Sequence, residues 1–503
     1  MRSGPPSDHP RSGQESARPG SLLPVRPHPD RLLGIDAAIL RIARELYESV
    51  AAAPIISPHG HVSAELLADN RRFPDPATLL ITPDHYVTRL LHSAGVPLER
   101  LGVEAAGAET PLTGAAAPRE IWRTFCEHWY RFAGTPVRYW FEDTLARVFE
   151  VDVTPSAESA DELFDALSGR LAEPSFRPRE LLSCFSVELL ATTDDPTDTL
   201  EHHRRLAELS DWPTRVVPTL RADAYMTPGT AGWQARLERL AETAGVDCGS
   251  YLGLLEAIRR RRECFRALGA TATDCGVADA WAVPLSDERA QALHERGLDG
   301  SITAEEALAY RRNMLFQFGL MAADDGLVMQ LHAGVLRNHH APTFARFGPD
   351  TGHDIPAPTY FAEPLRELLN RVGTSENFRL VLFTVDETAF SRELAPLAGF
   401  YPSVYVGAPW WFLDAPAAVR RFRAAVTETA GFHKTSGFID DTRALCSIPS
   451  RHDMSRRLDA SYLAELVVGH QLSEQEAHTI ARALVDEIPR NAFRLDRNRE
   501  RLD

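Results

Sequence analysis

Residues 54–61 have the sequence Pro54-Ile55-Ile56-Ser57-Pro58-His59-Gly60-His61. The β-branched pair near its start is typical of a short buried strand, and the two histidines follow where that strand would end. In an extended segment residues i and i+2 point to the same face, so both imidazoles can converge on one cation. Two histidines at this spacing also occur by chance, but their position directly after a strand favours a metal site.

Seven further apolar or β-branched runs of strand length follow, each succeeded by a turn and a helical pattern. They are residues 187–193, 215–220, 271–274, 326–331, 380–385, 404–407 and 437–440. Strands that alternate with helices form βαβ units, because parallel neighbours need a crossover of a dozen or more residues. Eight such units predict an α/β fold in the form of a closed (β/α)8 TIM-like barrel. Enzymes of that fold carry their chemistry at the carboxyl ends of the strands.

Two segments lie outside this regular pattern. Residues 1–30 are rich in Pro, Ser, Gly and Arg, which predicts a disordered tail. Residues 62–186 separate the first strand from the second, and a structureless loop of that length is uncommon in a compact domain, so we expect a large helical insertion. Residues 31–61 would hold an amphipathic helix over 35–50 and barrel strand 1, and residues 187–503 would form the remainder of the barrel.

The composition narrows the classes of function. The chain has 54 Lys+Arg against 70 Asp+Glu, a net charge of −16, and an acidic surface repels nucleic acid. Lys434 is the single lysine and there is no G-x-x-x-x-G-K-[ST] phosphate loop, which disfavours mechanisms that need a lysine. No apolar stretch has the length of a membrane span, and six scattered cysteines fit a reducing compartment. We therefore expect a cytoplasmic enzyme with neither a nucleic-acid nor a membrane partner.

Several polar residues follow the predicted strands. His332 ends one run and could supply a third nitrogen or a hydrogen bond to a substrate, although a histidine there is more often structural. Asp441 and Arg443 are two residues apart and offer a hard oxygen ligand and a bidentate fork for a carboxylate, although a surface turn would look the same. Arg221 directly follows the run 215–220.

Two aromatic pairs complete the candidate set. His85-Tyr86 can act as a proton-transfer pair if both side chains face the site, whereas an exposed turn is the more frequent explanation. Trp410-Trp411 follows the run 404–407, and indole faces stack on sugar rings, although paired tryptophans most often simply pack. Each signal is weak alone, and their common position at one barrel end favours a shared site.

The chain resembles the uronate isomerase (glucuronate isomerase) family of the amidohydrolase superfamily from about Leu32 to Leu495. The matching motifs occur in order along the chain. They are Pro54 to His61, Asp84 to Tyr86, Arg131 to Gly134, Thr192 to Pro196, Pro218 to Arg221, Met329 to His332, Leu336 to Asn338, Gly348 to Gly352, Trp410 to Phe412, Asp441 to Arg443 and Arg451-His452.

The resemblance implies one divalent metal ion, usually zinc, with His59, His61 and Asp441 as its ligands. It implies a small-molecule hexuronate partner, with D-glucuronate and D-fructuronate interconverted and D-galacturonate and D-tagaturonate as a second pair. A homo-oligomer is left open. The residues that it places around the substrate are Arg221, His332, Trp410, Trp411 and Arg443.

The catalytic residues that the resemblance suggests are His85, Tyr86 and Asp441. We expect Tyr86, assisted by His85, to move the proton between C2 and C1 through an enediol. The reason is that a phenol near a cation ionises more readily than its usual pKa of about 10 suggests. Asp441 would move the proton during ring opening, and Arg443 or Arg221 would bind the C6 carboxylate.

Two other functions stay open from the sequence. A metal-dependent hydrolase, a lactonase or amidase of a sugar acid derivative, could use the same barrel with Asp441 as base. A non-catalytic sugar-acid binder is the second. The chain also departs from the family at Ser57-Pro58, at Gly60 where cysteine is common, and at Cys275 where histidine is usual, which leaves the preferred sugar acid open.

Overall fold

The computed structural model describes residues 24–106 and 116–496. Residues 1–23 of the expected disordered tail lie outside the described residues, whereas residues 24–30 are described and Val25 lies in the hydrophobic core. The helix expected over residues 35–50 is present as α1 (Ala37–Glu48). It begins at Asp36, whose carboxylate accepts hydrogen bonds from the first-turn amides and so caps the helix.

Parallel strands form the centre of the fold. One sheet has the order β1-β2-β3 and contains β1 (Ile55–Ser57), β2 (Val187–Ala191) and β3 (Arg215–Val217). The other has the order β10-β9-β6-β5-β4 and contains β4 (Leu220–Arg221), β5 (Ala272–Val277), β6 (Val328–Ala333), β9 (Leu380–Thr384) and β10 (Val404–Val406). Every pair within these two sheets is parallel. The predicted α/β fold with a parallel sheet is therefore confirmed.

The strand pattern differs from the prediction in two places. The run 215–220 forms two strands, because Pro218 has no N–H to donate to a ladder; β3 pairs with β2 and β4 pairs with β5. In the run 437–440 no strand is described, because Gly437 has φ +72° and leaves the extended conformation. Within the described residues the ladders thus form two sheets and not one continuous eight-stranded barrel.

Isolated contacts join the edges of the two sheets. Asp194 and Leu220 form a parallel bridge that continues β2 towards β4. Val406 bridges Thr435 on the other side, two residues before the last predicted run. The amide of His61 donates to the carbonyl of Thr442 at 3.0 Å, so this final segment lies against the chain that follows β1.

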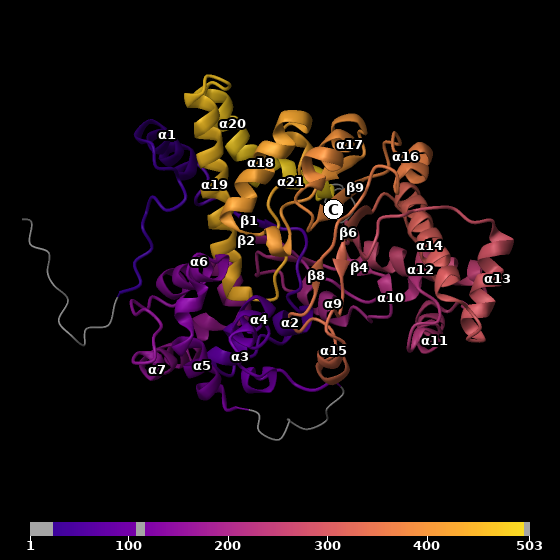
Figure 1. Ribbon diagram of the computed structural model, residues 1–503, viewed down its shortest axis with the longest axis horizontal. Coiled ribbons are helices and arrows are strands. Elements are labelled where there is room, and N and C mark those ends of the chain that lie inside the picture. The colour runs from indigo at the N-terminus through magenta and orange to yellow at the C-terminus, as the bar shows by residue number, and fades with distance from the viewer. Residues whose placement is uncertain (1–23, 107–115, 497–503) are drawn as a thin grey trace, which may run out of the picture.

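The described part of the segment between β1 and β2 contains helices and no strand. These helices gather at the lower left of Figure 1 and are α2 (Ala64–Asp69), α3 (Pro76–Leu80), α4 (His85–Ser93), α5 (Pro118–Glu127), α6 (Pro136–Asp143), α7 (Ala160–Leu171) and α8 (Pro178–Cys184). Their buried aromatic side chains belong to the same hydrophobic core as β1 and β2, so these helices pack on the sheet rather than standing apart.

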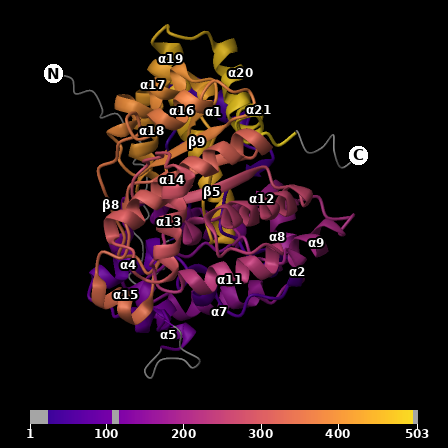
Figure 2. The ribbon, with the colours of Figure 1, turned by 90° about the vertical axis from the view of Figure 1, so that its right-hand side faces the viewer.

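The remaining helices follow the later strands. They are α9 (Glu201–Ala207), α10 (Asp223–Met226), α11 (Trp233–Ala244), α12 (Tyr251–Ala267), α13 (Asp287–Leu298), α14 (Ala304–Asp325), α16 (Arg366–Val372), α17 (Ala395–Phe400), α18 (Pro416–Ala430), α19 (Ile448–Val468), α20 (Glu474–Val485) and α21 (Glu487–Phe493). Figure 2 shows α11 to α14 together on the face turned to the viewer. Helix α19 is buried along nearly its whole length, because α1, α18 and α20 pack around it.

An element that the sequence did not predict lies between β6 and β9. Residues 334–360, here called the flap, contain β7 (Val335–Leu336) and β8 (Ile355–Pro356), which pair antiparallel, and α15 (Ala341–Phe347). No side chain of α15 is buried. The flap is nevertheless anchored in the hydrophobic core by Val335, and Phe347 packs against that core.

Candidate active site

A cavity of about 470 Å³ lies where β1, β4 and β6 end. Its lining includes every residue that the sequence suggested as a site residue. These are His59, His61, His85, Tyr86, Arg221, His332, Trp410, Trp411, Asp441 and Arg443.

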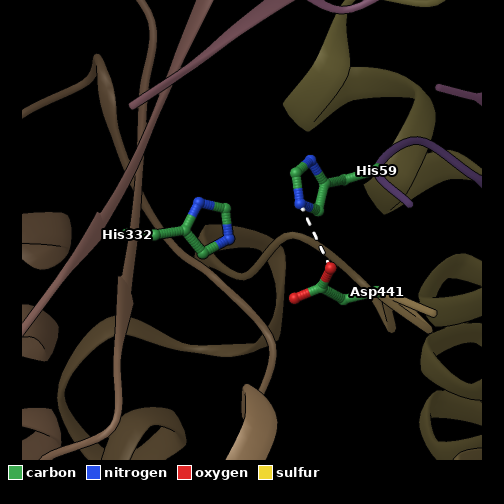
Figure 3. Close-up of side chains that lie close together, drawn as sticks. All are labelled: His59, His332 and Asp441. Atoms are coloured by element: carbon green, nitrogen blue, oxygen red, sulfur yellow. Dashed lines mark ion pairs between the residues drawn. The ribbon is translucent and has the colours of Figure 1, made fainter. Parts of the chain in front are cut away.

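Three of these side chains meet at one point. The Nε2 atoms of His59 and His61 lie 3.3 and 2.9 Å from the same Oδ1 atom of Asp441. The ring of His332 stacks on that of His59 with centroids 4.8 Å apart, and the candidate ligand atoms of His59, His332 and Asp441 lie within 4.8 Å of one another. Figure 3 shows the side chains of His59, His332 and Asp441 converging from separate segments of the chain. We call His59, His61, His332 and Asp441 the donor cluster.

The electrostatics of the donor cluster suit a cation. Burial by itself would raise the pKa of Asp441, but His59 and His61 hold it well below its usual range. Burial lowers the pKa of His59, and Asp441 outweighs that effect so that the net direction is upward. The Nε2 atom of His332 is buried without a hydrogen-bond partner among the described residues. Imidazole nitrogens and a carboxylate oxygen are the donors that zinc prefers, so the residues present fit a divalent metal ion.

Arg221 is held rigidly at the edge of the cavity by two carboxylates. Its Nε atom donates to Oδ2 of Asp223 at 2.8 Å, and its Nη1 atom lies 3.1 Å from Oδ2 of Asp274. Asp223 also accepts the amide of Gly276 at 3.0 Å, which ties the arrangement to the end of β5. The guanidinium therefore keeps one orientation before any ligand arrives.

His85 and Tyr86 reach the cavity because they form the first turn of α4. The carboxylate of Asp84 caps this helix and accepts the amide of Tyr86 at 2.8 Å. The two rings stack 4.9 Å apart, and Trp411 meets the edge of His85 at 5.1 Å.

The pKa directions of His85 and Tyr86 show which protonation states burial favours. Burial lowers the pKa of His85 to about 3, so its imidazole is neutral at neutral pH. Burial also raises the pKa of Tyr86 well above its usual range, although Arg451 acts in the opposite direction. Loss of hydration thus outweighs Arg451 and keeps the Tyr86 phenol protonated, and its easier ionisation beside a bound metal ion stays a prediction.

The flap adds charged residues that were not singled out from the sequence. Arg443 donates from Nη2 to Oδ2 of Asp350 at 3.0 Å. Arg337 donates from Nη1 to Oδ1 of Asp350 at 3.3 Å and to Oδ2 of Asp354 at 3.0 Å. Arg337 and Asp350 both line the cavity. The available signal was their position in two of the family motifs, Leu336 to Asn338 and Gly348 to Gly352.

Arg451 was also missed as a lining residue. It lies in the first turn of α19 and donates from Nη1 to Oδ2 of Asp414 at 2.8 Å. Its guanidinium carbon is 3.7 Å from the ring centroid of Trp140 and 5.1 Å from that of Tyr86. Burial raises the pKa of Asp414 to about 7. Arg451 thus links α19 to α4 and α6 at the cavity wall.

The fold and the cavity together define an α/β enzyme in which histidines, a carboxylate and several arginines meet at the carboxyl ends of parallel strands. The chain belongs to the glucuronate isomerase family, whose model matches residues 38–492.

Individual relatives match over almost the whole chain. The uronate isomerase of Corynebacterium efficiens is 48% identical over 469 residues, which cover 93% of this chain and 98% of that protein. The uronate isomerase of Rhizorhabdus wittichii is 47% identical over 475 residues, covering 94% and 100%. The crystal structure of glucuronate isomerase from Caulobacter crescentus superimposes with a TM-score of 0.91 at 43% identity, covering 94% of this chain and 98% of that one. The predicted family and the prediction of an isomerase over a hydrolase are confirmed.

Two further observations concern the single lysine and the expectation of no membrane partner. Lys434 does not line the cavity; its Nζ atom donates to the carbonyls of Tyr401 and Pro402, so it does not reach the donor cluster. Among the described residues, no helix has both the length and the apolar character needed to cross a membrane.

Proposed function

We propose that this enzyme interconverts D-glucuronate and D-fructuronate, with D-galacturonate and D-tagaturonate as a second pair. The observation that carries the proposal is that one cavity brings the donor cluster together with four arginines, Arg221, Arg337, Arg443 and Arg451. A hexuronate presents several hydroxyls and one carboxylate, and a guanidinium group binds a carboxylate bidentately. The names of the relatives, uronate and glucuronate isomerase, agree with this substrate class.

We propose that His59, His61 and Asp441 hold one divalent metal ion, which we expect to be zinc. His332 lies within reach of the same centre as a fourth donor. Such an ion supplies Lewis-acid polarisation of substrate oxygens when it is bound. Support for this assignment comes from the convergence of the ligand atoms and from the ionised state of the Asp441 carboxyl.

The chain's own residues would divide the remaining work. Arg443 and Arg221 bind the carboxylate and neighbouring oxygens, and Trp410 and Trp411 cover the apolar face of the sugar. After ring opening, one proton moves from C2 to C1 and another from O2 to O1 through an enediol, and we assign these transfers to Tyr86 and His85. Tyr86 enters as the protonated phenol and His85 as the neutral imidazole. Asp441, ionised, takes the proton of the anomeric hydroxyl and passes it to the ring oxygen as the C1–O5 bond breaks.

We also propose that the two parallel sheets and residues 437–440 together make the wall of a single (β/α)8 barrel. The bridges of Asp194 with Leu220 and of Val406 with Thr435 support this. Residues 62–186 would then be its helical insertion, between a first part at 31–61 and the remainder at 187–503. The cytoplasmic location and the homo-oligomer stay predictions.

Isomerisation in deuterated water tests the proposed function. Purified enzyme loaded with zinc should convert D-glucuronate to D-fructuronate, and NMR should show deuterium entering C1 of the ketose and C2 of the aldose. The variant Tyr86→Phe should lose most of this exchange, whereas Tyr130→Phe, which changes an exposed tyrosine, should behave like the wild type. No turnover of any hexuronate, with hydrolysis of a sugar lactone instead, would contradict the proposal.

A further inference from the structure

We propose that Asp350 takes the place of the substrate carboxylate in the free enzyme. Its side chain pairs with the guanidinium of Arg443, and a sugar acid replaces it in that pair when it binds. The inference rests on the proposed function, since it takes the ligand to be a sugar acid.

The first support is the geometry of the pair. Oδ2 of Asp350 accepts from Nη2 of Arg443 at 3.0 Å, and both residues line the cavity. In the described part of the chain, Asp350 is the one ion-pair partner of Arg443. Asp350 therefore holds the position that a ligand carboxylate would take to bind Arg443.

The second support is the contrast with the other arginines of the cavity. Arg221 is paired with Asp274 and Arg451 with Asp414, whereas Arg337 contacts both Asp354 and Asp350. The carboxylates of Asp274, Asp414 and Asp354 are buried. Taking a partner away from a buried pair leaves an uncompensated charge and is costly. The side chains of Arg443 and Asp350 are each 41% exposed, and an exposed pair contributes little to stability. Arg443 is thus the one of these four arginines that has no buried carboxylate partner in the described residues, and its exposed partner can be exchanged.

The third support is how the backbone presents Asp350. Its φ is +60°, in the left-handed region that few side chains adopt, and it lies between Gly348 at φ +79° and Gly352 at φ +92°. A Cβ atom on Gly352 would lie 2.7 Å from the Cβ of Arg89, so this turn is seated against α4, the helix that carries His85 and Tyr86. The turn therefore seats Asp350, which lines the cavity, beside the helix that carries His85 and Tyr86.

Exchange of this kind has a consequence for affinity. Each sugar acid must displace Asp350 before it can use Arg443, so the pair weakens the binding of substrate and product alike. An enzyme that works in both directions gains from releasing its product readily, because binding substrate and product more tightly without binding the transition state more tightly does not raise kcat.

Binding of D-gluconate tests the inference. D-Gluconate is an open-chain sugar acid that lacks the carbonyl group, so the enzyme cannot isomerise it. In calorimetry with the full-length, zinc-loaded enzyme, Asp350→Asn should bind D-gluconate about two- to fivefold more tightly, the range expected for removing one exposed ion pair. Uncharged D-sorbitol should bind equally to the variant and the wild type. Asparagine tolerates the left-handed backbone well, so the turn should persist.

Two controls decide between exchange and simple repulsion. Glu387→Gln also removes a carboxylate from an exposed ion pair, the one with Arg421. Because Glu387 does not line the cavity, this substitution should leave the affinity for gluconate unchanged. In an Arg443→Met background, checked by thermal unfolding, Asp350→Asn should give no gain. An equal gain without Arg443, unchanged or weaker binding in Asp350→Asn, or no gluconate binding by any form would overturn the inference. Failure of hexuronate turnover would sink the proposed function alone, because the gluconate result does not depend on turnover.

Discussion

The Nδ1 atom of His332 lies 2.7 Å from Oδ1 of Asp274, across the adjacent parallel strands β6 and β5. Burial opposes ionisation of Asp274, but His332 and Arg221 together hold its pKa far below its usual range. An ionised carboxylate only accepts hydrogen bonds, so Nδ1 of His332 carries the hydrogen and Nε2 is the nitrogen with a free lone pair in the donor cluster. One carboxylate thus orients both an imidazole and the guanidinium of Arg221.

Replacing Asp274 tests this positioning role. Asp274→Asn keeps the shape but lets an amide NH2 face His332 or Arg221, so kcat/KM for D-glucuronate should fall about 10- to 100-fold. Steady-state kinetics with metal analysis measures the effect. Asp165→Asn, at an exposed carboxylate outside the cavity, should match the wild type. Wild-type activity in Asp274→Asn would show that the orientation of His332 does not depend on this contact.

Removing the paired imidazoles tests the metal assignment. His59→Ala combined with His61→Ala should abolish stoichiometric zinc in elemental analysis of the purified enzyme, because half of the donor cluster is lost. His433→Ala combined with His470→Ala changes two exposed histidines that do not line the cavity and should retain the metal. Equal zinc in both double variants would place the metal site elsewhere.

Phe125 tests how far the helices between β1 and β2 depend on their aromatic core. Its side chain is fully buried, and the rings of Trp122, Trp129, Phe132 and Phe141 lie 4.7 to 5.6 Å from it. Phe125→Ala should lower the free energy of unfolding by about 3–5 kcal/mol. Urea unfolding followed by tryptophan fluorescence measures the change. Tyr130→Ala, at an exposed ring, should shift the midpoint little, and a similar small shift for Phe125→Ala would contradict the prediction.

Asp194 predicts a pH dependence of stability. Thr192 donates to its carboxylate at 2.6 Å, and burial raises its pKa to about 7, against about 3.9 in an unfolded chain. Between these two values the native state keeps a proton that the unfolded chain has released. The stability contributed by this group is therefore complete below about pH 4 and is lost as the pH rises through 7.

Asp194→Asn resembles the protonated form at every pH. The difference between its Tm and that of the wild type should therefore increase as the pH is raised from about 4 to about 7. These limits are the pKa values of Asp194 in the unfolded and the folded chain. Thermal unfolding by circular dichroism across this interval measures the trend. Asp165→Asn, at an exposed carboxylate, supplies the comparison, and a difference for Asp194→Asn that stays constant with pH would count against the assignment.

Several features could be predicted because they depend on neighbours in sequence. The strand at Ile55–Ser57 follows from β-branched residues, and the common face of His59 and His61 follows from the two-residue period of extended backbone. The amphipathic pattern around α1 is equally local. The division of residues 215–220 into two strands also had a local signal in Pro218, which strand periodicity alone did not reveal.

Other features depend on segments that are far apart in the chain. Asp350 reaches Arg443 from an exposed flap, and Arg451 reaches Tyr86 and Trp140 from a C-terminal helix, so neither contact has a spacing that a sequence pattern could reveal. The pKa direction of Tyr86 was also beyond prediction, because it is set by how much water the folded chain removes from the phenol.

The sequence by itself determined the α/β alternation, the family and the residue types available to hold a cation and a carboxylate, since periodicity and motif order are properties of the linear chain. Only the tertiary structure decided that Asp441 contacts His59 and His61, that His332 lies beside them, and that Asp350 pairs with Arg443. The physical reason is that distance and burial, which govern ion pairing and protonation, exist only once remote segments have packed together.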